Sequence, residues 1–186
     1  MTRIAIVVGS TRPGRRAHEI AAWVAGIAAD RTDAEYEIVD LVDYDLPLLD
    51  EEVPPSLGQY SQEHTKRWAA TVASFDGFVF VTPEYNHSMS AALKNALDFV
   101  YAEWNNKAAG FVSYGTSNGA RAVEHLRGVM AELQIADVRA HVGLSLLTDF
   151  EAWTVFKPTQ YHTDSVTTLL DQVVAWSTAL APLRNR

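Results

Sequence analysis

The chain has 186 residues, of which 48% are hydrophobic and 20% are charged, and its formal net charge is −8. This composition is typical of an ordinary globular protein, and the negative charge argues against nucleic acid as a partner because phosphates would be repelled. The absence of cysteine excludes a disulfide framework, a thiol nucleophile and a cysteine-ligated metal site. Because there is neither a signal peptide pattern nor an apolar run long enough to cross a bilayer, we expect a single cytoplasmic domain spanning residues 1–186.

Apolar, β-branched segments alternate with helical patterns five times along the chain. The predicted strands are 3–8, 35–41, 77–82, 108–113 and 138–144, and the predicted helices are 17–29, 59–75, 90–104, 118–133 and 165–183. The first and third strands carry continuous apolar runs, which is typical of strands buried on both faces of a parallel sheet. The alternation predicts right-handed βαβ units. We therefore expect an α/β three-layer sandwich, in which helices cover both faces of a five-stranded parallel sheet of flavodoxin-like order 2-1-3-4-5.

The loop after the first predicted strand, residues 9–16, is suited to an anion. A helix is predicted directly after it, and the free N–H groups and dipole of a helix N-terminus favour negative charge. Ser10 and Thr11 offer hydroxyl donors, and the three arginines of the loop offer charge-assisted bonds to phosphate oxygens. The loop matches neither G-x-x-x-x-G-K-S/T nor G-x-G-x-x-G, which argues against a P-loop NTPase and a dinucleotide-type Rossmann site. The alternative is a basic helix turn without a ligand.

Two further loops, residues 82–88 and 113–119, also follow predicted strands. In an open parallel sheet, ligands bind beyond the carboxyl ends of the strands, so both loops are candidate parts of a site. Tyr85 places an aromatic ring where a flat ligand can lie, and the glycines of the later loop allow a ligand to approach the backbone closely. Alternatively, Tyr85 is a packing residue of a tight turn, and the later loop is a flexible turn capped by Ser117 or Asn118.

Taken together, these segments resemble the NAD(P)H-dependent FMN reductase family. The resemblance covers nearly the whole chain and rests on four motifs in the family's order: Gly9-Ser10-Thr11-Arg12-Pro13-Gly14-Arg15, Pro83-Glu84-Tyr85-Asn86, Leu93-Lys94-Asn95-Ala96-Leu97-Asp98 and Ser113-Tyr114-Gly115. It implies a flavodoxin-like fold, FMN as the bound cofactor and NAD(P)H as co-substrate. It also implies a homodimer or homotetramer with the flavin near a subunit boundary. The family includes quinone, azo-dye and chromate reductases.

The resemblance implies a role for each matching residue. The loop that holds the FMN phosphate is matched by Ser10, Arg12 and Arg15, with the backbone of Thr11 and Gly14. The turn that lies along the isoalloxazine ring is matched by Pro83, Glu84, Tyr85 and Asn86. The loop near the other edge of the ring is matched by Ser113, Tyr114 and Gly115.

The chain departs from the family pattern after Asn86, where the family often has a glycine and, later, a Pro-Gly pair. This chain has His87 and Met89-Ser90-Ala91 at those places, so we expect the start of the following helix to be built differently. His87 is either a substrate contact or an exposed side chain without a role. Glu84 is either a general acid or a carboxylate that stabilises the turn.

The predicted activity is transfer of hydride from NAD(P)H through bound FMN to a small-molecule acceptor, such as a quinone, a flavin or an azo compound, by a ping-pong mechanism. Because the cofactors carry out the chemistry, no catalytic side chain and no metal site is predicted. Two alternatives remain open: a flavodoxin-like electron carrier without nicotinamide activity, and a protein that uses the fold without a flavin. Neither nucleic acid nor a membrane is expected as a partner.

Overall fold

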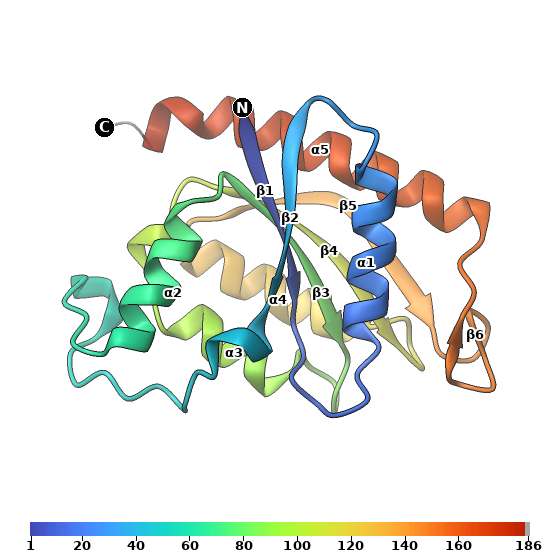
Figure 1. Cartoon of the computed structure of the whole chain (residues 1–186), viewed down its shortest axis with the longest axis horizontal. Coiled ribbons are helices and arrows are strands. Elements are labelled where there is room, and N and C mark those ends of the chain that lie inside the picture. Colours follow the sequence, from blue (N-terminus) through green and yellow to red (C-terminus); the bar gives the residue numbers. More distant parts are fainter. Residues whose placement is uncertain (185–186) are drawn as a thin grey trace.

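The structure, a computed structural model, describes residues 1–184; the last two residues of the predicted domain, Asn185 and Arg186, lie outside the described residues. Five parallel strands form one sheet of order β2-β1-β3-β4-β5, which confirms the predicted fold (Figure 1). The strands are β1 (Thr2–Val8), β2 (Ala34–Asp40), β3 (Gly77–Pro83), β4 (Ala108–Gly115) and β5 (Ala136–Ser145). The helices are α1 (Ala17–Ala28), α2 (Glu63–Ala73), α3 (Ala91–Asp98), α4 (Ala120–Glu132) and α5 (Gln160–Arg184).

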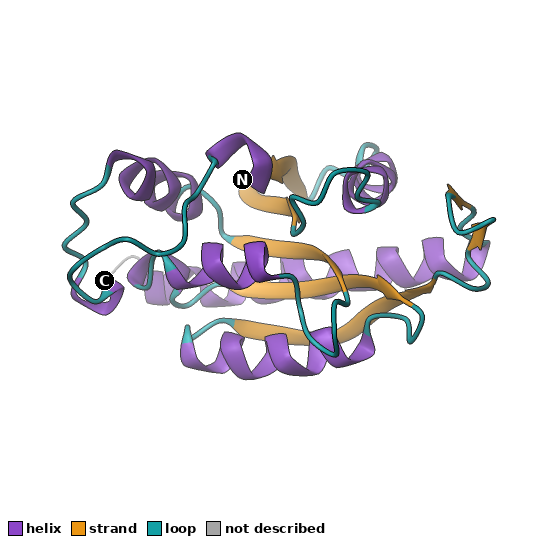
Figure 2. Ribbon diagram, turned by 90° about the horizontal axis from the view of Figure 1, so that it is seen from below, coloured by secondary structure: helices purple, strands orange, loops and turns teal. Residues whose placement is uncertain are grey.

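Helices cover both faces of the sheet (Figure 2). Helices α1 and α5 contribute Ile20 and Leu169 to a buried cluster with Ile6 and Val79 of the sheet. Helices α2, α3 and α4 cover the opposite face, in a second buried cluster built around Trp68. All residues of β3 and β4 are buried, which explains why their sequences show no polar alternation.

The predicted helix 90–104 is shorter in the structure, because α3 ends at Asp98 and a separate 3₁₀ turn, η3 (Ala102–Trp104), follows it. Phe99 still has helical backbone angles, with φ −65° and ψ −29°, and its N–H donates to the Asn95 carbonyl at 3.2 Å. The backbone leaves the helical conformation by Tyr101, with φ −127° and ψ −64°. Phe99 and Trp104 are both fully buried, so the predicted apolar residues lie in the core although the helix ends earlier than predicted.

Other element boundaries also shift. The predicted second strand ends one residue early, because the Asp40 side chain accepts a hydrogen bond from Val42 N and starts the 3₁₀ helix η1 (Leu41–Tyr44). The predicted helix 59–75 begins only at Glu63, after a second 3₁₀ turn, η2 (Pro55–Leu57). A short antiparallel hairpin, β6 (Phe150–Glu151) and β7 (Val155–Phe156), precedes α5 and was not predicted. No helix within residues 1–184 is long and apolar enough to span a membrane.

Lys107, which immediately precedes β4, has a buried amino group. Its side chain is only 5% exposed, and Nζ donates a hydrogen bond to the Val72 carbonyl at 2.7 Å. Burial, and secondarily the nearby positive charge of Arg184, lower the pKa of Lys107 to about 8. The fold therefore favours the neutral amine, whereas the unfolded chain keeps the amine protonated up to its ordinary pKa near 10.5.

We expect the free energy of unfolding of the wild type to rise between about pH 8 and pH 10.5, because in this range the unfolded state binds a proton that the folded state has released. The Lys107→Met variant should lack this part of the rise. Urea unfolding of both proteins at pH 7.5 and pH 10 measures the difference. An equal change of stability with pH in both proteins would contradict a depressed pKa at Lys107.

Candidate functional site

The loops singled out in the sequence meet at one edge of the sheet. Strands β1, β3 and β4 are neighbours and run parallel, so their carboxyl ends lie side by side (Figure 1). The loop from Gly9 to Arg16 joins β1 to α1, the loop after Pro83 joins β3 to α3, and the loop after Gly115 joins β4 to α4. This is the edge at which open parallel sheets bind ligands.

The first loop passes close to the neighbouring strand. The Gly9 amide donates to the Val81 carbonyl at 2.8 Å, and a Cβ atom on Gly9 would lie 2.8 Å from the same oxygen. A side chain cannot be accommodated there without moving the backbone, so the position requires glycine. The next residue, Ser10, is buried, and its hydroxyl lies 3.0 Å from the hydroxyl of Tyr85. The sequence motifs of the first and second loops are thus joined directly.

A second bond ties the first loop to α3. Ser90 is the N-cap of α3, where its hydroxyl oxygen accepts from Leu93 N at 3.1 Å. The same hydroxyl donates to the carbonyl of Gly9. The helix start therefore rests on a serine cap in this chain, at a place where the sequence departs from the family's Pro-Gly pattern.

The three arginines of the first loop have different surroundings. Arg15 forms an ion pair with Asp40, at the end of β2, with 2.6 Å between nitrogen and oxygen. Arg16 is the N-cap of α1 and lies 4.0 Å from Glu19. Arg12 is exposed, and its guanidinium carbon lies 6.0 Å from the centre of the Tyr85 ring. Because an arginine N-cap offers no acceptor for the free N–H groups of the first helical turn, the positive end of α1 stays open to an anion.

A cavity of about 380 Å³ lies beside these arginines. It is lined by Arg12, Gly14, Arg15, Arg16, Tyr85, Tyr114, Leu146, Trp153 and Thr154. Two buried polar atoms of its lining residues, the Tyr114 hydroxyl and Arg15 Nε, have no hydrogen-bond partner among residues 1–184. Burial raises the pKa of Tyr114 above its ordinary value near 10. The arginines and the N-terminus of α1, which no side chain caps, lie beside this cavity, and this arrangement suits an anion with several oxygens.

The second loop contains a two-residue turn at its tip. The amide and carbonyl groups of Tyr85 and Ser88 bond to each other at 2.9 and 3.1 Å. The two residues between them, Asn86 and His87, both have positive φ, at 48° and 73°. This backbone favours Asn followed by Gly, which is the family's pattern, and His87 adopts it at some cost in strain. The His87 side chain is exposed, with its ring centre 6.1 Å from that of His125 on α4.

Glu84 is buried behind this turn. Its side chain is 4% exposed and pairs with Arg121 of α4. The Arg121 backbone N–H, in the first turn of α4, also donates to Glu84 Oε2 at 3.1 Å. The carboxylate thus joins the second loop to the N-terminus of α4, and the side chain does not line the arginine cavity. This geometry supports a stabilising role for the carboxylate.

In the third loop, the hydroxyl of Ser113 does not face the arginine cavity. Ser113 is fully buried; its hydroxyl donates to the Asn118 carbonyl at 2.7 Å and lies 2.8 Å from His141 Nε2 on β5. Burial lowers the pKa of His141, which favours the neutral ring. Tyr114 instead lines the arginine cavity. Neighbouring residues of one strand therefore face opposite sides, and only one of them reaches the cavity.

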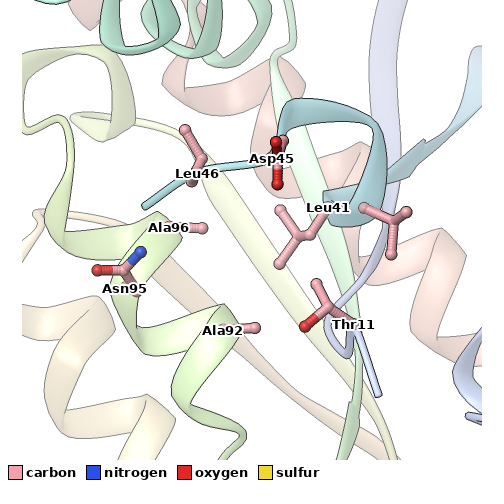
Figure 3. A pocket seen from close by; sticks show the side chains of 8 residues that line it. Thr11, Leu41, Asp45, Leu46, Ala92, Asn95 and Ala96 are labelled. Atoms are coloured by element: carbon pink, nitrogen blue, oxygen red, sulfur yellow. The ribbon is translucent and has the colours of Figure 1, made fainter. Parts of the chain in front are cut away.

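A smaller cavity of about 280 Å³ lies between the first loop, η1 and α3 (Figure 3). Thr11 lines it, opposite Leu46 and Ala92. Asn95, also on its wall, donates to the Pro47 carbonyl and accepts from the backbone of Leu49. The Leu-Lys-Asn-Ala-Leu-Asp motif of the sequence therefore fixes the loop after β2. Thr11 does not share the cavity of Arg12.

Comparison with known proteins places this geometry in a family. A family model described as NADPH-dependent FMN reductase matches residues 2–149. The chain belongs to this family. An NAD(P)H-dependent FMN reductase from Schizosaccharomyces pombe is 42% identical over 149 residues, which are 79% of this chain and 74% of that protein.

One further relative and one solved structure are also similar to this chain. A 2-hydroxy-1,4-benzoquinone reductase from a Burkholderia species is 34% identical over 140 residues, covering 72% of each chain. The solved structure of FerB, a flavoenzyme NAD(P)H:(acceptor) oxidoreductase from Paracoccus denitrificans, has a TM-score of 0.74 at 20% identity. The match covers 96% of this chain and 98% of the FerB chain, and it shows that the two proteins share a fold.

Within this FMN reductase fold, half of the predicted site residues approach one cavity. Arg12, Gly14, Arg15, Tyr85 and Tyr114 line it, and Ser10 bonds to one of them. The others, Thr11, Pro83, Glu84, Asn86, Ser113 and Gly115, do not line it. Sequence reasoning missed Leu146, Trp153 and Thr154, which come from the segment after β5. The one sequence signal that could have pointed to this segment is Trp153, a tryptophan in a stretch without helical or strand periodicity.

Proposed function

We propose that the protein is an FMN-containing NAD(P)H oxidoreductase and that the arginine-lined cavity holds the phosphate of FMN. The observation that carries the proposal is the group of three arginines, Arg12, Arg15 and Arg16, that lines this cavity at the N-terminus of α1, where no side chain caps the helix. A phosphate has enough acceptor oxygens to satisfy all of them. Membership of the FMN reductase family supports FMN as the molecule that carries this phosphate.

In this proposal each part of the site has a defined task. Arg12 and the N-terminus of α1 bind the phosphate, while Asp40 holds Arg15 in position from behind. The turn after β3 uses the amides of Tyr85 and Ser88 for its own bonds, so the peptide groups of Asn86 and His87 are free to bond the edge of the ring. Bound FMN supplies the hydride chemistry, accepting from NAD(P)H and passing electrons to a second substrate. The protein supplies position and access, and no side chain is needed as acid or base.

In this proposal the second substrate is a small molecule, such as a quinone, a flavin or an azo compound. It would react at the exposed face of the flavin ring after NAD(P)H has left, which is a ping-pong mechanism. The quinone reductase activity named for the Burkholderia relative supports a quinone in particular. We also propose that residues 1–186 act as one FMN-binding domain and that the protein works as a homodimer or homotetramer. The cytoplasmic location expected from the sequence stays a prediction.

The proposal is tested by adding FMN to the purified protein and then NADH or NADPH without oxygen. We expect FMN to bind at micromolar concentrations or below, and one or both nicotinamides to bleach its absorbance near 450 nm. Reoxidation by a panel of quinones, azo dyes and free flavin then identifies the acceptor. Binding without bleaching would favour the electron-carrier alternative, and absence of FMN binding would exclude both flavin hypotheses.

The phosphate assignment is tested separately with Arg12→Ala. We expect this variant to bind FMN roughly tenfold more weakly, the effect of losing one charge-assisted hydrogen bond, while its affinity for riboflavin stays unchanged. Fluorescence titration with both ligands measures the difference. Arg139→Ala, an exposed arginine on the edge strand β5, is the matched control and should bind both ligands as the wild type does. Equal weakening of FMN and riboflavin would place Arg12 away from the phosphate.

A further inference from the structure

The hairpin β6–β7 brings an exposed tryptophan to the arginine cavity. Trp153 and Thr154, at its tip, line the cavity together with Arg12, Tyr85 and Tyr114. The hairpin lies beyond the end of β5, at the same edge of the sheet as the first loop, and projects from the body of the molecule (Figures 1 and 2). It follows the residues 2–149 that the family model matches, so this wall of the cavity is supplied by a segment outside the matched region.

The tip holds Trp153 in an unfavourable backbone conformation. Ala152 and Trp153 both have positive φ, at 49° and 63°, between Glu151 and Thr154, whose backbone groups bond at 3.0 Å. Such a turn prefers asparagine or glycine, and a bulky residue there is strained. The indole is also 57% exposed, although it is large and apolar. Strain and exposure together are features that binding sites retain and that packing alone would not favour.

The base of the hairpin is firmly anchored. Phe150 is buried, and its ring centre lies 5.1 Å from that of Phe156. Phe156 in turn packs edge-on against Trp23 of α1, with ring centres 5.2 Å apart. Lys157 N bonds to the Asp149 carbonyl at 2.8 Å and closes the base. The tip is therefore presented from a fixed support on the same helix whose N-terminus faces the cavity.

The chemistry of the cavity indicates what the indole contacts. Three arginines and three aromatic residues, Tyr85, Tyr114 and Trp153, line the same cavity. A ligand that satisfies both kinds of side chain has a phosphate and a flat aromatic system. We propose that Trp153 is a flavin-binding residue that packs its indole face against the ring system of FMN. This inference rests on the proposed function, and it adds a specificity-determining contact from outside the family motifs.

The experiment compares the FMN and riboflavin affinities of Trp153→Ala with those of the wild type. We expect roughly tenfold weaker binding of both ligands, because the lost contact is to the ring and not to the phosphate. Trp153→Phe keeps an aromatic face and should stay within about twofold of the wild type. Trp176→Ala removes a comparably exposed tryptophan, at 50% exposure on α5, and should change neither affinity. Unchanged urea midpoints confirm that the variants are folded.

A second readout does not depend on affinity. In the wild type, bound FMN should protect one tryptophan from quenching by acrylamide, and this protection should be absent in Trp153→Phe. Wild-type affinity in Trp153→Ala would overturn the inference and leave the proposed function intact. Equal loss in Trp153→Phe and Trp153→Ala would also overturn it, since the indole N–H would then be the contact. Failure of the wild type to bind FMN would overturn the proposed function together with the inference.

Discussion

Replacing Gly119 by alanine is expected to destabilise the protein by about 2–5 kcal/mol, combining a disfavoured left-handed backbone with overpacking of a tight site. Gly119 precedes α4 with φ at +71°. A Cβ atom there would lie 2.5 Å from Ser113 Cβ and 2.8 Å from the backbone nitrogen of Tyr114. Neither neighbour can move without displacing β4. Urea unfolding measures the loss, and FMN affinity should fall with it, because Tyr114 lines the proposed phosphate site.

Gly128→Ala is the matched control, because Gly128 lies within α4 and has open space where a Cβ would be placed. We expect this change to leave the protein as stable as the wild type or up to about 1 kcal/mol more stable, since alanine favours helix over glycine. If Gly119→Ala unfolds at the same urea concentration as Gly128→Ala, the contact of Gly119 with Ser113 is not as close as the structure has it.

Replacing Glu84 by alanine is expected to lower the free energy of unfolding by about 1.5–3 kcal/mol, which is the range for hydrogen bonds to a charged group. The Glu84 carboxylate is 4% exposed and accepts from both the side chain and the backbone N–H of Arg121. Its removal leaves the first turn of α4 without this acceptor. Urea denaturation and the thermal midpoint measure the effect.

Glu84→Gln separates this role from that of a general acid. The amide oxygen keeps one acceptor for the backbone of α4, so the loss of stability should be about half that of the alanine variant. With FMN bound, turnover per folded molecule should stay close to that of the wild type, because the carboxylate faces Arg121 and not the cavity. A fully folded Glu84→Gln variant that binds FMN but has lost turnover would revive the general-acid interpretation.

The sequence predicts the fold well because the signals for it are local. The continuous apolar run at 78–81 identifies a strand buried on both faces, and β3 is indeed buried throughout. Helix ends are harder to predict, since they depend on tertiary contacts. The predicted third helix ends at Asp98, and the chain continues into a separate 3₁₀ turn although the apolar pattern runs on to Trp104. The hairpin β6–β7 escapes prediction for a related reason, because strands of two residues are too short for periodicity to be visible.

The candidate site is predictable to the level of loops but not to that of side-chain direction. The arginine loop and Tyr85 meet as expected from parallel strands that end at one edge. Glu84 lies in the loop of Tyr85, and Ser113 lies at the end of the next strand, yet their polar groups bond to Arg121 and His141 and stabilise the framework. No pattern in the chain distinguishes a hydroxyl that faces a ligand from one that faces the next strand. The direction of each side chain depends on the neighbouring strand and helix, which the sequence pattern does not place.

The single hydroxyl of Ser90 has a consequence for local motion. It completes the cap of α3 and at the same time holds the carbonyl of Gly9 in the first loop. One group thus serves two segments that are far apart in the sequence, and the first turn of α3 cannot fray without breaking the bond from Ser90 to the loop. We therefore expect the loop and the helix start to open and close together. Any ligand that orders the loop therefore also stiffens the start of α3, although it touches no residue of that helix.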